Sequence, residues 1–142
     1  MLAFQNDVFE TMCSCAKNTY PRECCGILLG RQEKRRRIVY RILPTLNAAD
    51  AQESARRFLI DPLEIYRTEL AAEQEGLTIV GFYHSHPSGE EEVSEEDALH
   101  MIAGLSYPVV AVKKGICTAV RSFEKMERSD VVMQEEILIK ER

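Results

Sequence analysis

The first third of the chain shows the apolar spacing of one helix, followed by two short strands. Apolar residues recur three and four positions apart near the N-terminus, which predicts an amphipathic helix that ends within residues 18–21. These residues are Val8, Phe9, Met12, Cys15 and Ala16. The apolar run at residues 24–29 predicts a buried strand, and the alternation over residues 36–43 predicts its partner. The basic run at residues 34–37 falls at the turn between them.

A second helix is expected after a polar stretch without periodicity, residues 44–57, which predicts a loop. Asp61 suits the N-cap, Pro62 suits the first helical position, and Glu64 would complete a capping box. Gly76 should end this helix. Its buried face is expected to consist of Leu63, Tyr66 and Leu70.

The second half of the chain alternates again between strand and helix patterns. Residues 77–83 predict an apolar strand, residues 89–93 an acidic loop, and Ser94 the start of a third helix. The apolar face of that helix should comprise Ala98, Met101, Ile102 and Leu105. Three more strands are expected over residues 107–112, 116–123 and 131–139, the last two antiparallel, with a tight turn at residues 113–115. The pattern therefore predicts an α/β fold in which three helices pack on a mixed sheet of about six strands.

Length and composition narrow the class of protein. A chain of 142 residues with 45% hydrophobic residues fits one domain, residues 1–142, with a proper core. A net charge of -5 does not suggest nucleic-acid binding. The basic run at residues 34–37 is expected to be a solvated turn, with a partner-binding patch as the alternative. No apolar stretch approaches the roughly 20 residues that span a bilayer, and the N-terminus lacks a signal-peptide pattern, so a cytoplasmic location is expected.

The cysteines indicate packing rather than disulfide bonds. There are five, an odd number, and none form a C-x-x-C pair. Cys24 and Cys25 are expected to be buried strand residues, with sulfur chemistry as the alternative interpretation.

The strongest chemical signal is a group of potential metal ligands. His84 and His86 lie two positions apart, so on an extended segment both imidazoles face one way. Pro87 marks the end of that strand, and Asp97 follows in the first turn of a helix. Two imidazoles and one carboxylate suit Zn²⁺, with a further position for water. Such an ion activates water and polarises a carbonyl, which favours a metal-dependent hydrolase.

Each of these residues also has a structural explanation. Ser94 and Asp97 have the spacing of a capping box, and alone that is the favoured explanation of both. His84 and His86 could be a hydrogen-bonded pair near the end of a sheet. Ser94 is a candidate donor to a developing oxyanion. The local pattern leaves the general base open, because many glutamates are available.

The complete motif resembles that of a known family. His84-Ser85-His86-Pro87, six residues, Ser94, two residues and Asp97 match every fixed position of the JAMM motif of MPN-domain metalloproteases. The segment at residues 20–26 resembles the upstream strand start of that family, with Glu23 as its functional residue. The resemblance covers nearly the whole chain.

The resemblance assigns roles to these residues. It implies one zinc ion per chain, held by His84, His86 and Asp97, with Glu23 as general base and Ser94 stabilising the oxyanion. Asp97 should then turn its carboxylate to the metal rather than back to the cap. It also implies the MPN fold, which is similar in plan to that of cytidine deaminases. The deaminase signatures H-x-E and P-C-x-x-C are missing from the sequence, so a deaminase is disfavoured.

In its compact length, the chain resembles the proteins of the stand-alone bacterial branch of the family. By analogy, this implies an amide or isopeptide peptidase that acts after the C-terminal glycine of a ubiquitin-like or sulfur-carrier protein ending in Gly-Gly. Cysteine or a peptide would be released. The acidic residues of the 89–96 segment would favour carriers with a basic face. The alternative is a non-catalytic MPN scaffold, a class that typically lacks some of these residues.

Overall fold

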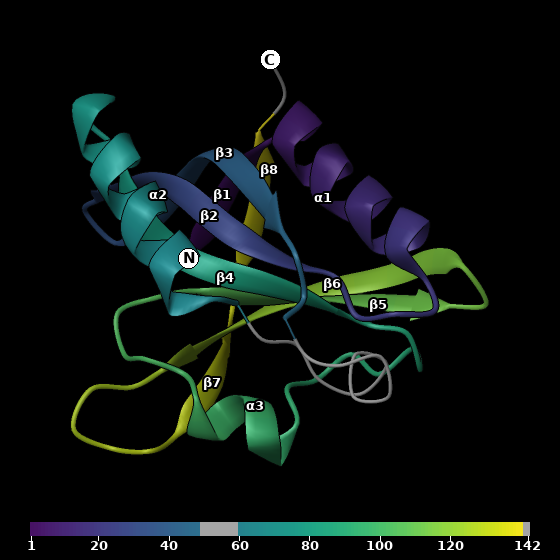
Figure 1. Cartoon of the computed structure of the whole chain (residues 1–142). Helices are drawn as coiled ribbons and strands as arrows, with labels where there is room; N and C mark the ends of the chain where they lie inside the picture. The colour runs from purple at the N-terminus through teal and green to yellow at the C-terminus, as the bar shows by residue number, and fades with distance from the viewer. Residues whose placement is uncertain (49–59, 141–142) are drawn as a thin grey trace.

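A computed structural model describes residues 1–48 and 60–140. Within them, three helices pack on an eight-stranded sheet, in the order β7-β6-β5-β4-β2-β3-β1-β8 (Figure 1). The helices are α1 (Asn6–Thr19), α2 (Pro62–Gln74) and α3 (Glu95–Leu99). The strands are β1 (Leu2–Gln5), β2 (Cys25–Glu33), β3 (Arg36–Thr45), β4 (Thr78–His86), β5 (Tyr107–Lys113), β6 (Ile116–Lys125), β7 (Val132–Glu135) and β8 (Ile137–Lys140).

The two edge strands of the sheet are consecutive in sequence. β7 and β8 lie at opposite ends of the strand order, yet only Glu136 separates them. The Leu2 N–H donates a hydrogen bond to the Glu136 carbonyl at 2.9 Å, next to the parallel pairing of β8 with β1. The sheet must therefore curl until its two edges meet at Glu136.

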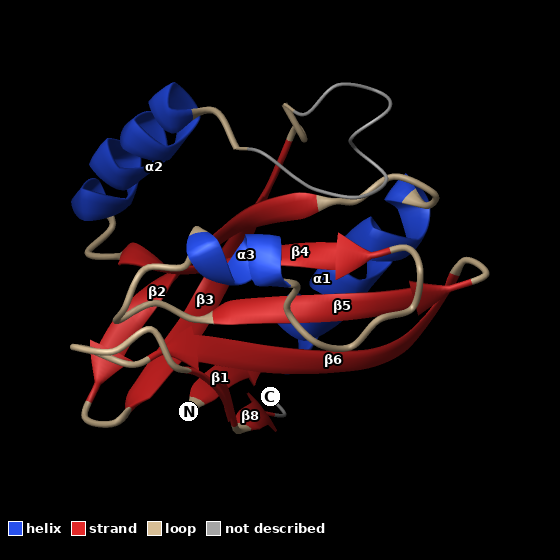
Figure 2. Cartoon of the chain, turned by 90° about the horizontal axis from the view of Figure 1, so that it is seen from below, coloured by secondary structure: helices blue, strands red, loops and turns tan. Residues whose placement is uncertain are grey.

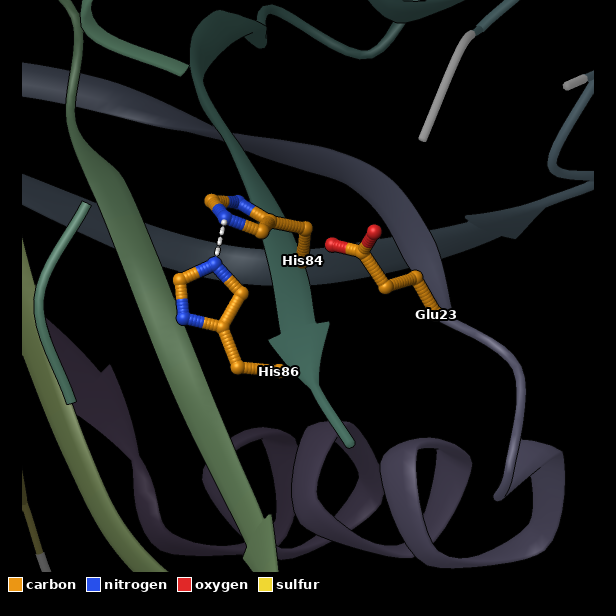
Figure 3. Close-up of side chains that lie close together, drawn as sticks. All are labelled: Glu23, His84 and His86. Atoms are coloured by element: carbon orange, nitrogen blue, oxygen red, sulfur yellow. Dashed lines mark hydrogen bonds between the residues drawn. The ribbon is translucent and has the colours of Figure 1, made fainter. Parts of the chain in front are cut away.

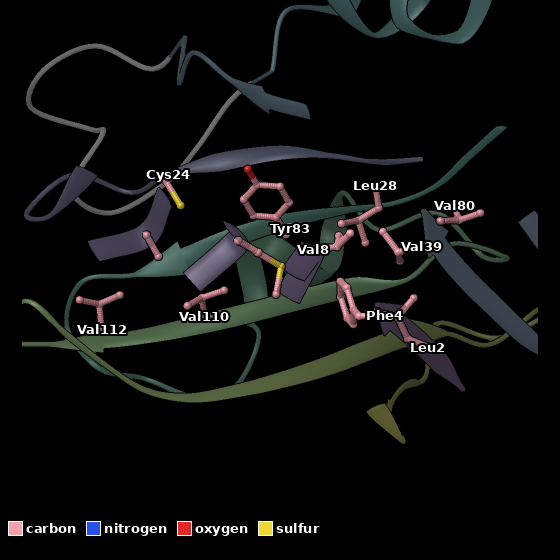
Figure 4. Packing of buried hydrophobic residues seen from close by; sticks show 12 residues of the cluster. Leu2, Phe4, Val8, Cys24, Leu28, Val39, Val80, Tyr83, Val110 and Val112 are labelled. Carbon is pink, nitrogen blue, oxygen red and sulfur yellow. The ribbon is translucent and has the colours of Figure 1, made fainter. Parts of the chain in front are cut away.

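The α1 side of the sheet holds the largest apolar cluster. Val8, Met12 and Ala16 of α1 are buried as predicted, while Phe9 and Cys15 are half-buried. The three buried residues and Phe9 pack on Leu28 of β2 and other strand residues of the same face (Figure 4). The predicted helix and its buried stripe are confirmed.

The opposite face of the sheet carries α3 (Figure 2). Alternate strand residues point to this side and form two further clusters, one below α2 and one below α3. Phe82 of β4 contacts both of them. Among the described residues, none of the helices combines the length and apolarity needed to cross a membrane.

The mixed α/β fold is confirmed, but the expected number of strands is wrong. β1 is a four-residue strand, too short for a periodic signal, and it pairs in parallel with β3 and β8. The single strand expected at residues 131–139 is two strands that separate at Glu136. β7 pairs antiparallel with β6 as expected, whereas β8 pairs in parallel with β1. These differences come from pairings between distant segments, which local alternation does not encode.

The buried face expected for α2 is also wrong. Leu63, Tyr66 and Leu70 are 51%, 58% and 47% exposed. Thr68 and Ala72 are the buried residues instead, because α2 meets the sheet mainly through β4 and a narrow stripe suffices there. The helix does begin as predicted, with the Asp61 carboxylate accepting a hydrogen bond from the Leu63 N–H at 3.0 Å. Among the described hydrogen bonds, the cap is this single bond and not a capping box.

The third helix is shorter than the apolar pattern indicated. α3 ends at Leu99, and the Met101 N–H bonds to the Ala98 carbonyl in a tighter turn. The Ile102 N–H donates to the Tyr107 hydroxyl at 2.8 Å, which satisfies it outside a helix. Met101 is still buried, so the pattern marked a packed segment correctly while its helical extent was wrong.

The basic run at residues 34–37 is only partly a solvated turn. Lys34 adopts a positive φ of 56° in the turn between β2 and β3. Arg37, however, belongs to β3 and lies 3.3 Å from the carboxylate of Glu124 and 3.6 Å from that of Glu135. Residues 49–57 of the expected loop lie outside the described residues, and β3 continues to Thr45.

Candidate active site

β4 carries both histidines of the motif at its C-terminal end. The strand continues three residues beyond the predicted end, through His86, and pairs with β2 and β5 there. His84 and His86 alternate with buried Ser85 and therefore face the α3 side together. Their side chains are 1% and 8% exposed. Pairing with the neighbouring strands therefore fixes the backbone that carries the two rings.

Asp97 comes to the histidines from the first turn of α3. Its Oδ2 lies 3.0 Å from His84 Nε2 and 3.2 Å from His86 Nε2. The same oxygen accepts a hydrogen bond from the Ser94 N–H at 3.2 Å, and the Asp97 N–H donates to Ser94 Oγ at 3.0 Å. This is a complete capping box. The expectation that Asp97 would turn away from the cap is wrong, because one oxygen reaches both partners.

The three facing atoms have the spacing of metal ligands. His84 Nε2 and His86 Nε2 are 3.1 Å apart, so the triangle with Asp97 Oδ2 has edges of 3.0, 3.1 and 3.2 Å. Ligand atoms about 2.0–2.1 Å from a tetrahedral Zn²⁺ stand roughly 3.3–3.4 Å apart. If both imidazoles donate through Nε2 to the Asp97 oxygen, their two Nε2 atoms cannot also form a hydrogen bond with each other, although they are only 3.1 Å apart. A cation satisfies all three atoms at once, so the residues fit zinc.

His86 is oriented from its other side. Its Nδ1 lies 3.2 Å from the Glu90 carbonyl oxygen, which can only accept a hydrogen bond. Nδ1 therefore carries a proton, and Nε2, which faces Asp97 and His84, is the ring nitrogen that can coordinate a metal. A histidine that donates its second ring N–H to a carbonyl is the usual arrangement at metal sites.

Glu23 faces the two histidines from the residues that precede β2 (Figure 3). A carboxylate oxygen of Glu23 and one nitrogen from each imidazole lie within 4.8 Å of one another. Glu23 is 1% exposed, and neither carboxylate oxygen has a hydrogen-bond partner among residues 1–48 and 60–140. An unpaired buried carboxyl is costly, which makes this residue unusual in a folded protein.

Local hydrogen bonds hold Glu23 in place. The Cys24 N–H donates to Ser85 Oγ at 2.8 Å, and the Ser85 N–H donates to the Cys24 carbonyl at 3.0 Å. On the other side, Asn47 Nδ2 donates to the Glu23 carbonyl at 3.1 Å. The backbone of Glu23 is thus tied to the middle of the His84-Ser85-His86 segment, and its carboxyl group is directed to the imidazoles.

The electrostatics separate the roles of the two carboxyl groups. Burial raises the pKa of Glu23 from 4.5 to about 8, with the Asp97 charge adding to this and His86 opposing it. Burial also acts against the Asp97 carboxylate, but the hydrogen bonds from His84 and His86 outweigh it and hold the pKa of Asp97 well below its usual range. Asp97 is therefore a permanent anion, whereas Glu23 can exchange a proton near neutral pH.

The pKa values of the two histidines are shifted in opposite directions. Burial lowers the pKa of His84, and its hydrogen bond to Asp97 only partly offsets this. Burial acts to lower the pKa of His86 as well, but the hydrogen bond and charge of Asp97 outweigh it, so the pKa of His86 is raised. His84 is thus held neutral, the form in which imidazole binds a metal.

A pocket opens beside His84, a feature that the sequence patterns did not reveal. It has a volume of about 410 Å³ and reaches His84 and Asp97. Apolar side chains from α2, β4, β5 and the segment after α3 form much of its wall, among them Ile65, Phe82, Met101 and Tyr107. These residues come from four separate segments, so only the tertiary fold assembles them. A mostly apolar pocket that ends at polar groups is the usual form of a ligand site.

The five residues singled out from the sequence thus lie close together in the structure. They are Glu23, His84, His86, Ser94 and Asp97. Cys24 and Cys25, beside Glu23, are buried as expected. Burial raises the pKa of Cys24 to about 12 and that of Cys25 to about 11, so neither thiol ionises readily.

Comparison with known proteins places the chain among bacterial relatives. Residues 5–126 match the family model of prokaryotic homologs of the JAB domain. A probable TtuB-protein conjugate cleaving protease from Thermus thermophilus is 36% identical over 77 residues, which is 54% of this chain and 47% of that protein. The match therefore spans about half the length of this curated relative.

Solved structures extend the likeness over the full chain. The solution structure of a protein from Desulfitobacterium hafniense has a TM-score of 0.86 and 30% identity, covering 100% of this chain and 94% of that one. The solution structure of a protein from Salinibacter ruber has a TM-score of 0.74 and 25% identity, covering 97% and 91%. The family match and these structures agree with the fold described above.

Proposed function

The chain belongs to the family of prokaryotic homologs of the JAB domain, the stand-alone bacterial JAMM/MPN proteins, and we propose that it is a zinc-dependent peptidase. The bond cleaved would be an amide or isopeptide bond after the C-terminal glycine of a ubiquitin-like or sulfur-carrier protein. The observation that carries this proposal is the buried Glu23 carboxyl group, which has no hydrogen-bond partner among the described residues and faces His84 and His86. A purely structural glutamate would not be held in this way.

His84, His86 and Asp97 would hold the zinc ion. Their three facing atoms already have nearly the mutual distances of zinc ligands. When bound, the ion supplies Lewis acidity, which makes water a better nucleophile at neutral pH and polarises the scissile carbonyl. Asp97 contributes a permanent negative charge, and His84 contributes a neutral ring.

Glu23 would act as general base and then as general acid. Its carboxylate would take a proton from the attacking water and pass it to the amine that leaves. A proton carrier works best when its pKa lies near the working pH, and burial brings the pKa of Glu23 to about 8. Neither of its carboxylate oxygens has a hydrogen-bond partner among the described residues, which suits a residue that acts on water rather than a fourth ligand.

Ser94 would stabilise the negative charge that develops on the carbonyl oxygen. Its Oγ accepts a hydrogen bond from the Asp97 N–H, and so its own O–H remains as a donor. The cap fixes the hydroxyl beside Asp97, so little reorganisation is needed during the reaction.

Two observations support the proposed class of substrate: the name of one relative and the acidic residues near the site. The Thermus thermophilus protein is named for cleaving TtuB-protein conjugates. Around this site, the loop before α3 and its first turn carry Glu90, Glu91, Glu92, Glu95 and Glu96. Such a surface favours a carrier protein with a basic face near its tail. The released group would be cysteine or a peptide, depending on what the carrier bears.

The alternative of a non-catalytic scaffold is disfavoured by the same buried carboxyl group. A scaffold needs neither an ionisable group with a raised pKa nor two imidazoles facing a permanent anion. In a scaffold, replacement of Glu23 by an apolar residue would stabilise the fold without loss of function.

A cleavage assay tests the proposal. Small proteins ending in Gly-Gly, each extended by cysteine or by a short peptide, are incubated with the purified protein and analysed by mass spectrometry. We expect cleavage after the second glycine, its loss with a chelator, and its return when Zn²⁺ is restored. Failure to cleave any carrier with zinc bound, or cleavage that persists without metal, would contradict the proposal.

A further inference from the structure

We propose that Arg121 of β6 is a positioning residue for His86, acting through Glu91 and the backbone carbonyl of Glu90. This inference rests on the proposed role of His86 as a metal ligand. Arg121 contacts neither histidine directly, and it belongs to a strand outside the sequence motif. Its effect is on the orientation of the ring, not on the chemical step.

The register of the sheet places Arg121 on the same face as the site. His84 of β4 pairs with Val109 of β5, and Val109 pairs with Arg121 of β6. Residues that are partners across neighbouring strands direct their side chains to one face of the sheet. Arg121 is therefore in the same lateral row as His84, two strands away, and its guanidinium emerges where the loop after β4 passes.

The contacts form a continuous path from Arg121 to the imidazole. Arg121 Nε donates to Glu91 Oε1 at 3.0 Å. Glu91 directly follows Glu90, whose carbonyl oxygen lies 3.2 Å from His86 Nδ1. Arg121 Nη1 also donates to Gln134 Oε1 of β7 at 3.4 Å, which anchors the guanidinium on the sheet. The carbonyl that sets the ring orientation is thus tied to β6.

A second hydrogen bond fixes the loop close to His86. The Gly89 N–H donates to the His86 carbonyl at 3.0 Å and closes a turn, in which Gly89 adopts a positive φ of 84°. This turn ends before Glu90. Within residues 88–93 as described, the only ion pair is the one between Glu91 and Arg121. The Glu90 carbonyl is therefore held between a glycine turn on one side and this ion pair on the other.

The expected size of the effect follows from exposure. Glu91 and Arg121 are 43% and 42% exposed, and exposed ion pairs contribute little to stability. We therefore expect loss of the pair to weaken zinc binding by about two- to five-fold rather than to abolish it. The direction of the change in zinc affinity is more informative than its size. Arg121 is a cation, so its removal should strengthen zinc binding if only its charge acted on the ion.

The test compares four variants, Arg121→Gln, Glu91→Gln, the double variant and the control Glu92→Gln. Glu92 is the next residue of the acidic loop and is exposed, with no ion pair among the described residues. Zinc affinity is measured by competition with a chromogenic chelator. Exchange of the His86 Nδ1–H with water is measured by NMR in the metal-free protein, which keeps the test independent of cleavage.

We expect Arg121→Gln and Glu91→Gln to weaken zinc binding by about two- to five-fold and to speed the exchange of the ring proton. The double variant should be no worse than either single one, because both remove the same contact. Glu92→Gln should resemble the wild type. Stronger zinc binding by Arg121→Gln, equal effects of Glu91→Gln and Glu92→Gln, or unchanged exchange would overturn the inference. A wild type that binds zinc but cleaves no carrier would count against the proposed function alone.

Discussion

Asp97 Oδ2 lies 3.2 Å from the backbone nitrogen of Ser94 and 3.0 Å from His84 Nε2. The oxygen that closes the cap of α3 is therefore also the one that faces the imidazoles. A helix cap positions a carboxylate with little freedom, since two hydrogen bonds define the first turn. The start of α3 thus holds an anionic group in a fixed position, as the proposed role of Asp97 as a ligand requires.

Replacement of Ser94 by alanine should destabilise the protein. Ser94→Ala removes the hydroxyl that accepts from the Asp97 N–H, and loss of such a cap costs about 1 kcal/mol. Urea unfolding of the metal-free protein measures the difference. Ser94→Thr keeps a hydroxyl and serves as the control. Equal free energies of unfolding for Ser94→Ala and the wild type would show that the cap contributes nothing.

Zinc should stabilise the wild type and should do so much less in Asp97→Asn. Asparagine can keep the cap through its side-chain oxygen but lacks the charge that attracts the ion. At a free zinc concentration 100 times the Kd, binding would add about 2.7 kcal/mol to the free energy of unfolding. Thermal melts with and without Zn²⁺ measure the shift. The same zinc-induced shift in both proteins would rule out Asp97 as a ligand.

The metal-free protein should lose stability relative to Glu23→Gln as the pH rises from about 4.5 to about 8. Burial raises the pKa of Glu23 from 4.5 to about 8, so in this interval the folded state holds a proton that the unfolded state has released. Stability then falls with increasing pH, by up to about 1.4 kcal/mol per pH unit. Groups that do not interact with Glu23 titrate alike in both proteins and cancel in the difference, whereas His86, whose titration is coupled to the Glu23 charge, contributes to it. Parallel stability profiles for the two proteins would show that Glu23 is not perturbed.

Two neighbouring alanines of α2 should respond differently to the same substitution. Ala71 is exposed, whereas Ala72 is 2% exposed and packs in the cluster below the helix. Ala71→Gln should change the free energy of unfolding by less than about 0.5 kcal/mol. Ala72→Gln should lower it by about 1–3 kcal/mol. Chemical denaturation compares them, and similar values would mean that α2 faces the sheet differently from the arrangement described here.

Local patterns predicted most of the elements because each depends on nearby residues. The buried stripe of α1, the Asp61 cap and the alternation of β3 are such features. The rotation of α2 was not predictable in this way. Leu63, Tyr66 and Leu70 have helical spacing, but only the tertiary structure shows that the sheet meets the other side of the helix. The strand pair β1 and β8 joins the two ends of the chain and has no local signal.

In the candidate site too, local spacing predicted some residues, whereas others depend on distant segments. His84, His86 and Asp97 lie on two adjacent elements, so their spacing alone indicated that they could meet. Glu23 precedes a distant strand, and only the resemblance to a family pointed to it. The apolar pocket beside His84 collects residues from four segments and was not foreseen. Arg121 was missed as well, because its relation to the site arises from the register of three strands.

The proposed mechanism depends most on the separation of roles between Glu23 and the three proposed ligands. The most direct measurement is the zinc content and cleavage rate of Glu23→Gln beside those of the wild type, on one carrier extended beyond Gly-Gly. We predict one zinc ion per chain in both proteins and a cleavage rate at least about 100-fold lower in Glu23→Gln, the loss typical of a missing general base. Cleavage by zinc-loaded Glu23→Gln at the wild-type rate would contradict the central claim.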